Sequence, residues 1–140
     1  MGDLDRVLEI EHLCYSNPWR PSSFIGEMEN PPFSKPYVIF VEPQKITIGY
    51  VIYWKIKEEI QISNIALHPD FQGMGIGETV MRRILDMCKK EGGEYVILEV
   101  RPSNSAARML YKKLDFQVMG VRRGYYQNPP EDAILMGRTL

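Results

Sequence analysis

The residues with the clearest chemical potential form a glycine-rich segment, Gln72-Gly73-Met74-Gly75-Ile76-Gly77, between a strand-like run and an amphipathic helix. A glycine loop that ends at a helix N-terminus leaves several backbone N–H groups unpaired and pointing in one direction. The helix dipole adds partial positive charge at the same place. The segment therefore predicts a binding site for a phosphate group.

The spacing excludes the two commonest phosphate motifs. A P-loop needs Lys followed by Ser or Thr after its last glycine, whereas Gly77 is followed by Glu78-Thr79. A dinucleotide fingerprint would need a glycine at position 78. The remaining pattern, a glutamine with glycines three and five residues later, resembles the diphosphate loop of the GCN5-related N-acetyltransferases (GNAT). A glycine-rich turn that only caps a helix is the alternative.

A second segment, residues 101–116, resembles the other cofactor segment of the same family, whose pattern is N-x-x-A-x-x-L-Y-x-x-x-G-F. Its matching residues Asn104, Ala107 and Tyr111 are three and four positions apart, which places them on one helix face. Asp115 stands where the family has a glycine, and we expect it to tolerate the left-handed conformation of a helix C-cap. The two segments occur in the family's order.

An acidic residue interrupts the apolar run Tyr95–Val100, which reads as a strand buried on both faces. An ionisable side chain in such a strand costs several kcal/mol unless it is paired or has a chemical task. The residues alone leave two interpretations of Glu99 open: a structural ion pair with Arg101 or another base, or a catalytic role.

The resemblance narrows to the RimI branch of the family, the ribosomal-protein N-terminal acetyltransferases with their archaeal and eukaryotic relatives. It is carried by Pro18-Trp19 and residues 98–101, 121–126 and 131–136, and covers nearly the whole chain. The implied fold is α/β, a mixed twisted sheet whose central parallel strands splay apart between flanking helices. The family's first edge strand has no counterpart here, and the sheet edge is either exposed or covered by a partner.

The resemblance implies acetyl-CoA as cofactor, with direct transfer to an amine in a ternary complex. Glu99 is then the general base, directly or through one water, Tyr111 the general acid toward the coenzyme sulfur, and the Leu67 N–H the oxyanion donor. Neither cysteine lies in a nucleophile motif, so no acyl-enzyme is expected. The implied cofactor-binding residues are Ile65, Ala66, Leu67, Gln72, Gly73, Met74, Gly75, Ile76, Gly77, Glu78, Asn104, Ala107 and Tyr111.

The expected acceptor is the N-terminal α-amine of a protein or peptide, in a groove walled by Trp19, Tyr125 and Tyr126. An α-amine has a reference pKa of about 7.7 to 8.0, against about 10.4 for lysine, so one carboxylate base has less deprotonation to supply. The alternatives to this groove role are that Trp19 only covers the core and that Tyr125 and Tyr126 only pack across a hairpin. A lysine or small-molecule acetyltransferase and a non-catalytic acyl-CoA-binding module are the competing functions.

The elements that must position these residues follow from periodicity. Helices are expected over residues 3–15, from a cap at Ser22-Ser23 to near Asn30, and from Ile76 to Gly92-Gly93. Leu13 belongs to the apolar stripe of the first helix, and His12 to its solvated side. Strands are expected over residues 37–42, 46–56, 59–67 and 95–100, followed by a hairpin over 116–139. The strands at 59–67 and 95–100 should be parallel.

The apolar alternation of residues 60–67 slips by one position at Ser63-Asn64. Because side chains alternate with period two, the slip predicts a β-bulge, the alternative being a strand buried on both faces.

Length, composition and net charge indicate the number of domains and the classes of partner. A chain of 140 residues with 44% hydrophobic content is the size of one domain, residues 1–140. A net charge of −1 gives no field that attracts nucleic acid or an anionic membrane, and no apolar run approaches a membrane span. We expect a cytoplasmic protein that is a monomer or a weak homodimer and binds no metal. Cys14 and Cys88 are expected to be reduced core residues.

Overall fold

A computed structural model describes residues 3–29, 33–41, 45–127 and 130–140. One six-stranded sheet, in the order β1-β2-β3-β4-β6-β5, carries helices on both faces. The strands are β1 (Ser34–Val41), β2 (Ile46–Ile56), β3 (Glu59–Leu67), β4 (Tyr95–Val100), β5 (Gln117–Tyr126) and β6 (Glu131–Thr139). The helices are α1 (Leu4–Cys14), α2 (Pro21–Glu29), α3 (Ile76–Lys90) and α4 (Ser105–Lys113), and a short 3₁₀ turn covers Pro69–Phe71.

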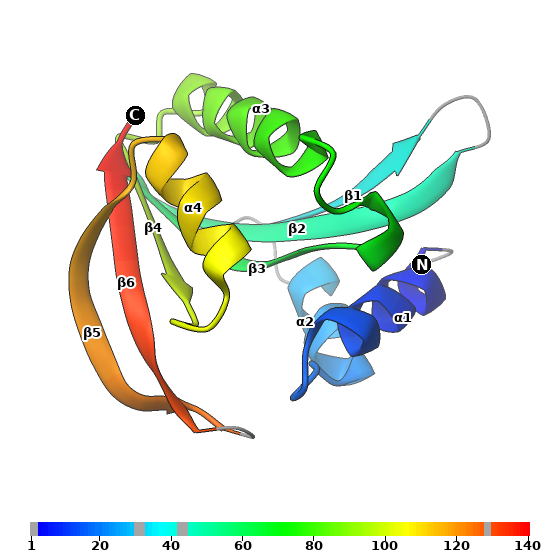
Figure 1. The fold of residues 1–140 in the computed structure, drawn as a ribbon. Coiled ribbons are helices and arrows are strands. Elements are labelled where there is room, and N and C mark those ends of the chain that lie inside the picture. The colour runs from blue at the N-terminus through cyan, green and yellow to red at the C-terminus, as the bar shows by residue number, and fades with distance from the viewer. Residues whose placement is uncertain (1–2, 30–32, 42–44, 128–129) are drawn as a thin grey trace.

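Two apolar cores form because each sheet face receives its own pair of helices (Figure 1). The larger core lies under α3 and α4, and its fully buried members include Ile60, Met81 and Val96. The smaller core lies under α1 and α2 and includes Ile10, Phe24 and Tyr50.

The predicted bulge is confirmed. Ile52 lies opposite Asn64 and the next residue, Tyr53, lies opposite Ile62, so Ser63 is the extra residue in β3. Before Ser63 the even-numbered side chains pack in the core under α3, whereas after it Ala66 packs in the core under α1. The bulge accounts for the slip in alternation, and the strand also has no exposed residue, so the two interpretations do not exclude each other.

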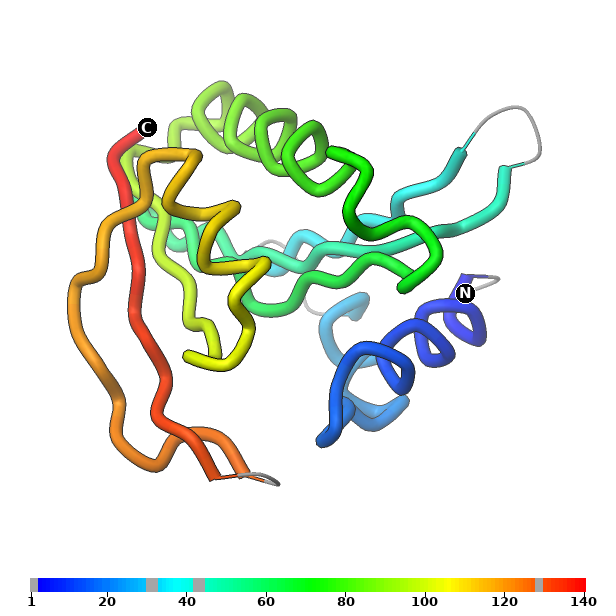
Figure 2. The backbone as a smooth tube through the Cα atoms, viewed as in Figure 1, coloured from blue at the N-terminus to red at the C-terminus, as the bar shows by residue number. Residues whose placement is uncertain are grey.

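The predicted splay of the two parallel strands is also confirmed. Strands β3 and β4 pair only from Glu59 with Tyr95 to Ile62 with Leu98. Beyond that point β3 stays with β2, as far as Leu67 opposite Gly49, and β4 stays with β6. The two strands therefore diverge directly after the bulge (Figure 2).

Most of the predicted first and last residues of the helices and strands are confirmed, with two differences. Strand β1 begins at Ser34 instead of Tyr37. Helix α2 begins at Pro21, because proline is preorganised for the first turn of a helix; Ser22 and Ser23 therefore lie inside that turn, and their predicted capping role is wrong. The predicted end near Asn30 lies outside the described residues.

Burial corrects two further predictions. Strand β4 is buried on one face only, so Glu99 lies on a half-buried face. On α1, His12 is exposed as predicted, but Leu13 is 53% exposed whereas Glu11 is only 1% exposed.

Within the described residues α1 precedes every strand, so β1 forms the sheet edge beside β2. None of the helices in those residues combines the length and the apolar character needed to cross a bilayer.

Candidate active site

The glycine loop joins the 3₁₀ turn to α3 through two residues with left-handed backbone. Gly73 has φ +76° and Gly75, the N-cap of α3, has φ +80°. A Cβ added at either position would meet nothing within 4 Å, so both present bare backbone to open space. Gly77 differs, since its Cβ would lie 3.5 Å from a methyl of Leu110 on α4. Backbone N–H groups at the start of α3 are therefore open to an anion.

The start of the loop is tethered to the end of β3. The Gln72 side chain donates from Nε2 to the Leu67 carbonyl at 2.8 Å, and the Cys14 thiol donates to the same oxygen at 3.1 Å. Cys14 is half-buried at the edge of the smaller core beside the loop, so its predicted core position is confirmed only in part, whereas Cys88 is buried; both are free thiols. Gln72 holds the loop in place through its side chain.

The ladder between β2 and β3 determines which backbone groups of β3 face the splay. The His68 N–H donates to the Ile48 carbonyl at 2.7 Å, which makes these two residues a hydrogen-bonded pair. Such pairs alternate with non-hydrogen-bonded ones in antiparallel strands. Leu67 and Ile65 therefore direct their N–H and C=O groups away from β2 toward the splay, while Ala66 directs its own to β2.

The other members of the predicted loop set have distinct positions. Glu78 pairs with Arg82 at 3.1 Å and with Lys113 of α4 at 2.7 Å, and the Lys113 contact is the main cause that lowers its pKa. Its side chain links α3 to α4, so residue 78 can offer a ligand only its backbone. Met74 is 59% exposed at the loop surface.

Helix α4 places the other predicted cofactor residues. The Asn104 side chain caps the helix, accepting from the Ala107 N–H at 3.2 Å. Tyr111 is 6% exposed and packs on Phe116 with ring centroids 5.7 Å apart. Burial raises the pKa of Tyr111 to about 12, so its phenol keeps its proton at neutral pH. Asp115, with φ +69°, adopts the expected left-handed conformation.

The carboxylate of Glu99 lies on the opposite sheet face from α4. Oε1 is 3.4 Å from Arg122 of β5, while Oε2 is buried and has no hydrogen-bond partner among the described residues. The structural interpretation allowed Arg101 or another base as the partner; the base is Arg122, and Arg101 pairs with Glu131 at 3.1 Å. A buried carboxylate oxygen without a partner is rare in native proteins. Oε2 is therefore available to a water molecule or to a ligand.

Three tyrosines gather around this carboxylate and the splay. Burial, and then the nearby Glu99, raise the pKa of Tyr126 to about 12. Burial is also the main cause that raises the pKa of Tyr15 well above its usual value, and Tyr111 is the next. Tyr15, which the sequence analysis missed, donates to the Ile65 carbonyl, a group that the splay leaves without a strand partner. The glutamate and the three tyrosines thus converge where β3 leaves β4.

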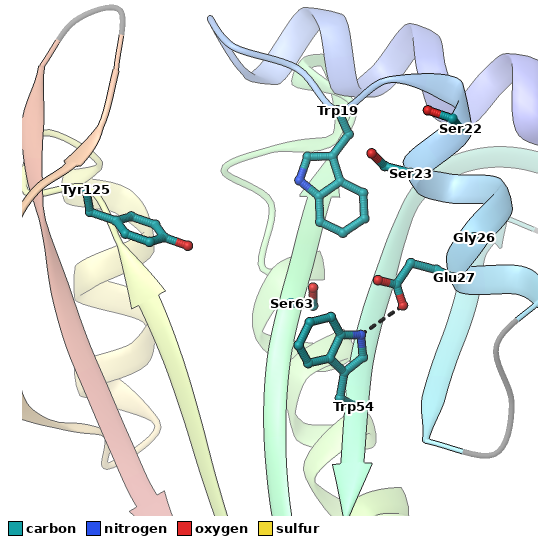
Figure 3. Close-up of a pocket in the computed structure, with 8 residues that line it drawn as sticks. All are labelled: Trp19, Ser22, Ser23, Gly26, Glu27, Trp54, Ser63 and Tyr125. Atoms are coloured by element: carbon teal, nitrogen blue, oxygen red, sulfur yellow. Dashed lines mark hydrogen bonds between the residues drawn. The ribbon is translucent and has the colours of Figure 1, made fainter.

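The predicted acceptor residues divide into two groups. Trp19 and Tyr125 line the same pocket of about 530 Å³, which opens between α2, the bulge of β3 and β5 (Figure 3). Trp19 also packs on Phe24 at 5.1 Å, so it covers the core and walls the pocket at once. Tyr126 does not line this pocket; its ring lies under the Arg101 guanidinium at 4.4 Å and contacts the Tyr125 ring at 5.0 Å.

The residues present fit a ligand that combines a diphosphate with an extended arm. The open loop backbone suits the diphosphate, and the splay leaves the N–H of Leu67 on an edge of β3 that β4 does not cover. A carboxylate oxygen without a partner and a protonated phenol lie at the end of that gap. This set can accept a proton from one reactant and donate one to another.

Comparison with known proteins agrees with this geometry. The Acetyltransferase (GNAT) family model matches residues 4–116. A Haemophilus influenzae protein named [ribosomal protein bS18]-alanine N-acetyltransferase is 33% identical over 99% of this chain and 93% of its own length. A Bacillus subtilis protein with a provisional name of the same kind is 36% identical over 100% of this chain and 91% of its own.

A solved structure extends the match to three dimensions. The ribosomal-protein-S18-alanine N-acetyltransferase of Escherichia coli superposes with a TM-score of 0.88 at 30% identity, over 99% of this chain and 88% of that one. Sequence and fold thus agree over the same residues. The chain belongs to the GNAT family of acetyltransferases.

Proposed function

We propose that this acetyltransferase transfers the acetyl group of acetyl-CoA directly to the N-terminal α-amine of a protein. The observation that carries the proposal is the buried Oε2 of Glu99, which has no partner among the described residues and lies where β3 and β4 part. An amine that must lose a proton before it attacks needs such an acceptor. The catalytic unit we propose is one domain over residues 1–140.

The proposed cofactor site follows the loop and the splay. Backbone N–H groups from Gly73 to Glu78 bind the diphosphate, while Gln72 keeps the loop closed on β3. Asn104 and Ala107 lie at the N-terminus of α4 on the far side of the gap. GNAT enzymes use acetyl-CoA in general, and the cofactor supplies an activated thioester to whichever amine is bound.

The proposed proton transfers use both faces of the sheet. Glu99 takes the proton of the acceptor amine, directly or through one water. Tyr111, protonated because burial raises its pKa to about 12, donates to the departing thiolate from the α4 side. The Leu67 N–H donates to the carbonyl oxygen on which negative charge develops.

Two considerations support an α-amine over a lysine side chain. Relatives that match over 98–99% of this chain are named [ribosomal protein bS18]-alanine N-acetyltransferase and N-alpha-acetyltransferase RimI. The pKa of an α-amine is also about 2 to 3 units lower than that of a lysine side chain, so a single carboxylate base can deprotonate it near neutral pH. A ribosomal protein or another nascent chain is the acceptor class we propose.

A panel of matched peptides tests the proposal. One peptide has a free N-terminal alanine and no lysine; its partner has a blocked N-terminus and one internal lysine. Acetylation of the first with little or none of the second is expected. Faster acetylation of the blocked peptide would assign the enzyme to lysine, and acetylation of neither, with acetyl-CoA still bound, would favour a binding module or a small-molecule acceptor.

A further inference from the structure

The pocket beside the acceptor groove contains one charged side chain among the residues that line it. They are Trp19, Ser22, Ser23, Gly26, Glu27, Trp54, Ser63 and Tyr125. Helix α2 and the preceding turn contribute five of these, and Trp54 of β2 and Ser63 of β3 form the opposite wall (Figure 3). The charge is negative, and hydroxyl groups and indole rings surround it. This is the chemistry of a cation site.

Hydrogen bonds hold Glu27 in one orientation. Its Oε2 accepts from the indole N–H of Trp54 at 2.8 Å and from the hydroxyl of Ser34. Both bonds fall on the same oxygen, and Oε1 has no bond of this kind to the residues that the structure describes. Figure 3 shows that second oxygen turned toward the space between the two indole rings. The carboxylate is therefore preorganised to accept from a ligand.

The two indoles add a second attraction for the same kind of ligand. A cation over the face of a tryptophan is stabilised by the ring's quadrupole, more so where water is partly excluded. Trp19 and Trp54 are both half-buried and lie on either side of the Glu27 carboxylate. A guanidinium suits this arrangement better than an ammonium, because it is planar, stacks on rings and donates through a fork.

The pocket adjoins the proposed reaction centre from the acceptor side. Ser63 is the bulge residue at which β3 leaves β4, and Tyr125 contacts Tyr126, whose pKa the Glu99 carboxylate helps to raise. A chain whose N-terminus reaches Glu99 therefore passes the mouth of the pocket with its following residues. The 530 Å³ volume is large enough for one long side chain.

We propose that the Glu27 pocket binds a cationic side chain, preferably arginine, of the acceptor, shortly after its N-terminal residue. This inference rests on the proposed function and names the substrate class of the same site. Acceptors are then peptides with a small free N-terminus and a basic residue close behind it.

Peptide binding to the CoA-loaded enzyme, measured by calorimetry, tests the pocket separately from turnover. The probes are neutral peptides with a free N-terminal alanine and one arginine placed at successive positions, each paired with a citrulline version. One position should bind about tenfold more tightly than its citrulline counterpart. Glu27→Gln, which keeps an acceptor for Trp54, should abolish that difference and leave the citrulline peptides unchanged. Glu29→Gln, on the exposed side of α2, is the matched control and should behave as the wild type.

The outcomes separate this inference from the proposed function. The cation-binding role of the pocket is overturned if arginine and citrulline peptides bind equally at every position. It is also overturned if Glu27→Gln still binds arginine peptides more tightly. Both results count even if the peptides are acetylated. If the enzyme binds arginine peptides more tightly than citrulline peptides only when Glu27 is present, but acetylates none of them, the pocket is retained and the N-terminal activity is overturned. The citrulline comparison in the wild type shows whether a cation site exists at all, and unchanged binding of the citrulline peptides by Glu27→Gln shows that the variant is folded.

Discussion

The carboxylate of Glu11 accepts a hydrogen bond from the backbone N–H of Trp19 at 2.7 Å. The same buried side chain also accepts from the hydroxyl of Tyr50 on β2 and from the amide of Asn64, next to the bulge, at 3.0 Å. Three donors from separate elements make the burial of this charge tolerable. One carboxylate thus holds the turn that carries Trp19 against the part of the sheet where β3 changes face.

Glu11→Gln should therefore raise KM for a peptide acceptor several-fold and leave KM for acetyl-CoA unchanged, because it loosens the Trp19 turn while the loop before α3 stays intact. It should also lower the free energy of unfolding by about 1–3 kcal/mol, the usual cost of a buried polar group that loses a partner. Steady-state kinetics and urea denaturation measure both effects. Glu9→Gln, on the exposed side of the same helix, is the control. An unchanged peptide KM would make Glu11 a residue of stability alone.

Gly75→Val should weaken acetyl-CoA binding by at least about tenfold, since a side chain would cover the N–H groups at the start of α3. Gly92→Val is a matched control. Both glycines have positive φ, +80° and +95°, and an added Cβ at either meets nothing within 4 Å. Each variant should therefore lose a similar stability, about 1–2 kcal/mol from the left-handed backbone alone. If calorimetry finds the same acetyl-CoA affinity in the two variants, this loop does not bind the diphosphate.

Local signals in the sequence were enough to predict the loop and the bulge, whereas the splay was predicted from the family resemblance. The alternation of residues 60–67 breaks at the bulge itself, and a glycine loop before a helix has a composition that few other structures share. The order of helices and strands followed from periodicity, because both cores bury regular apolar stripes.

Partners far apart in the chain could not be predicted in the same way. Helical periodicity could not predict the buried position of Glu11, because its partners Tyr50 and Asn64 are 39 and 53 residues away. Tyr15 acts on a carbonyl that becomes free only when the strands diverge. Glu99 pairs with Arg122 because the sheet order brings β5 near β4 across β6, and Arg101 pairs with Glu131.

Glu99→Gln should lower turnover by about 10²- to 10³-fold, the typical contribution of a general base, with acetyl-CoA affinity nearly unchanged. The amide keeps the shape of the side chain and removes the proton acceptor. Glu94→Gln, an exposed change just before the same strand, should retain full turnover. Rapid-quench or steady-state assays distinguish the two variants. If Glu99→Gln turns over like the wild type, Glu99 is structural and a water or backbone group accepts the proton.

Tyr111→Phe should lower turnover by about 10²-fold, in the usual range for a general acid, without loss of acetyl-CoA affinity. Tyr95→Phe, a change at an exposed ring at the start of β4 that has no proposed role in the site, is the control for turnover. Equal turnover in the two variants would exclude Tyr111 as the acid.

The same variant should also change how stability depends on alkaline pH. Burial raises the pKa of Tyr111 to about 12, from about 10 in the unfolded chain. Folding thus favours the protonated phenol, so this stabilisation is complete below about pH 10 and is lost as the pH rises toward about 12. Phenylalanine cannot titrate, and the free energy of unfolding of Tyr111→Phe should fall less steeply than that of the wild type in this window. Denaturant titrations from about pH 9 upward measure the two slopes. Parallel curves would mean that the phenol ionises as freely in the folded protein as in water, and would contradict the burial-raised pKa of Tyr111.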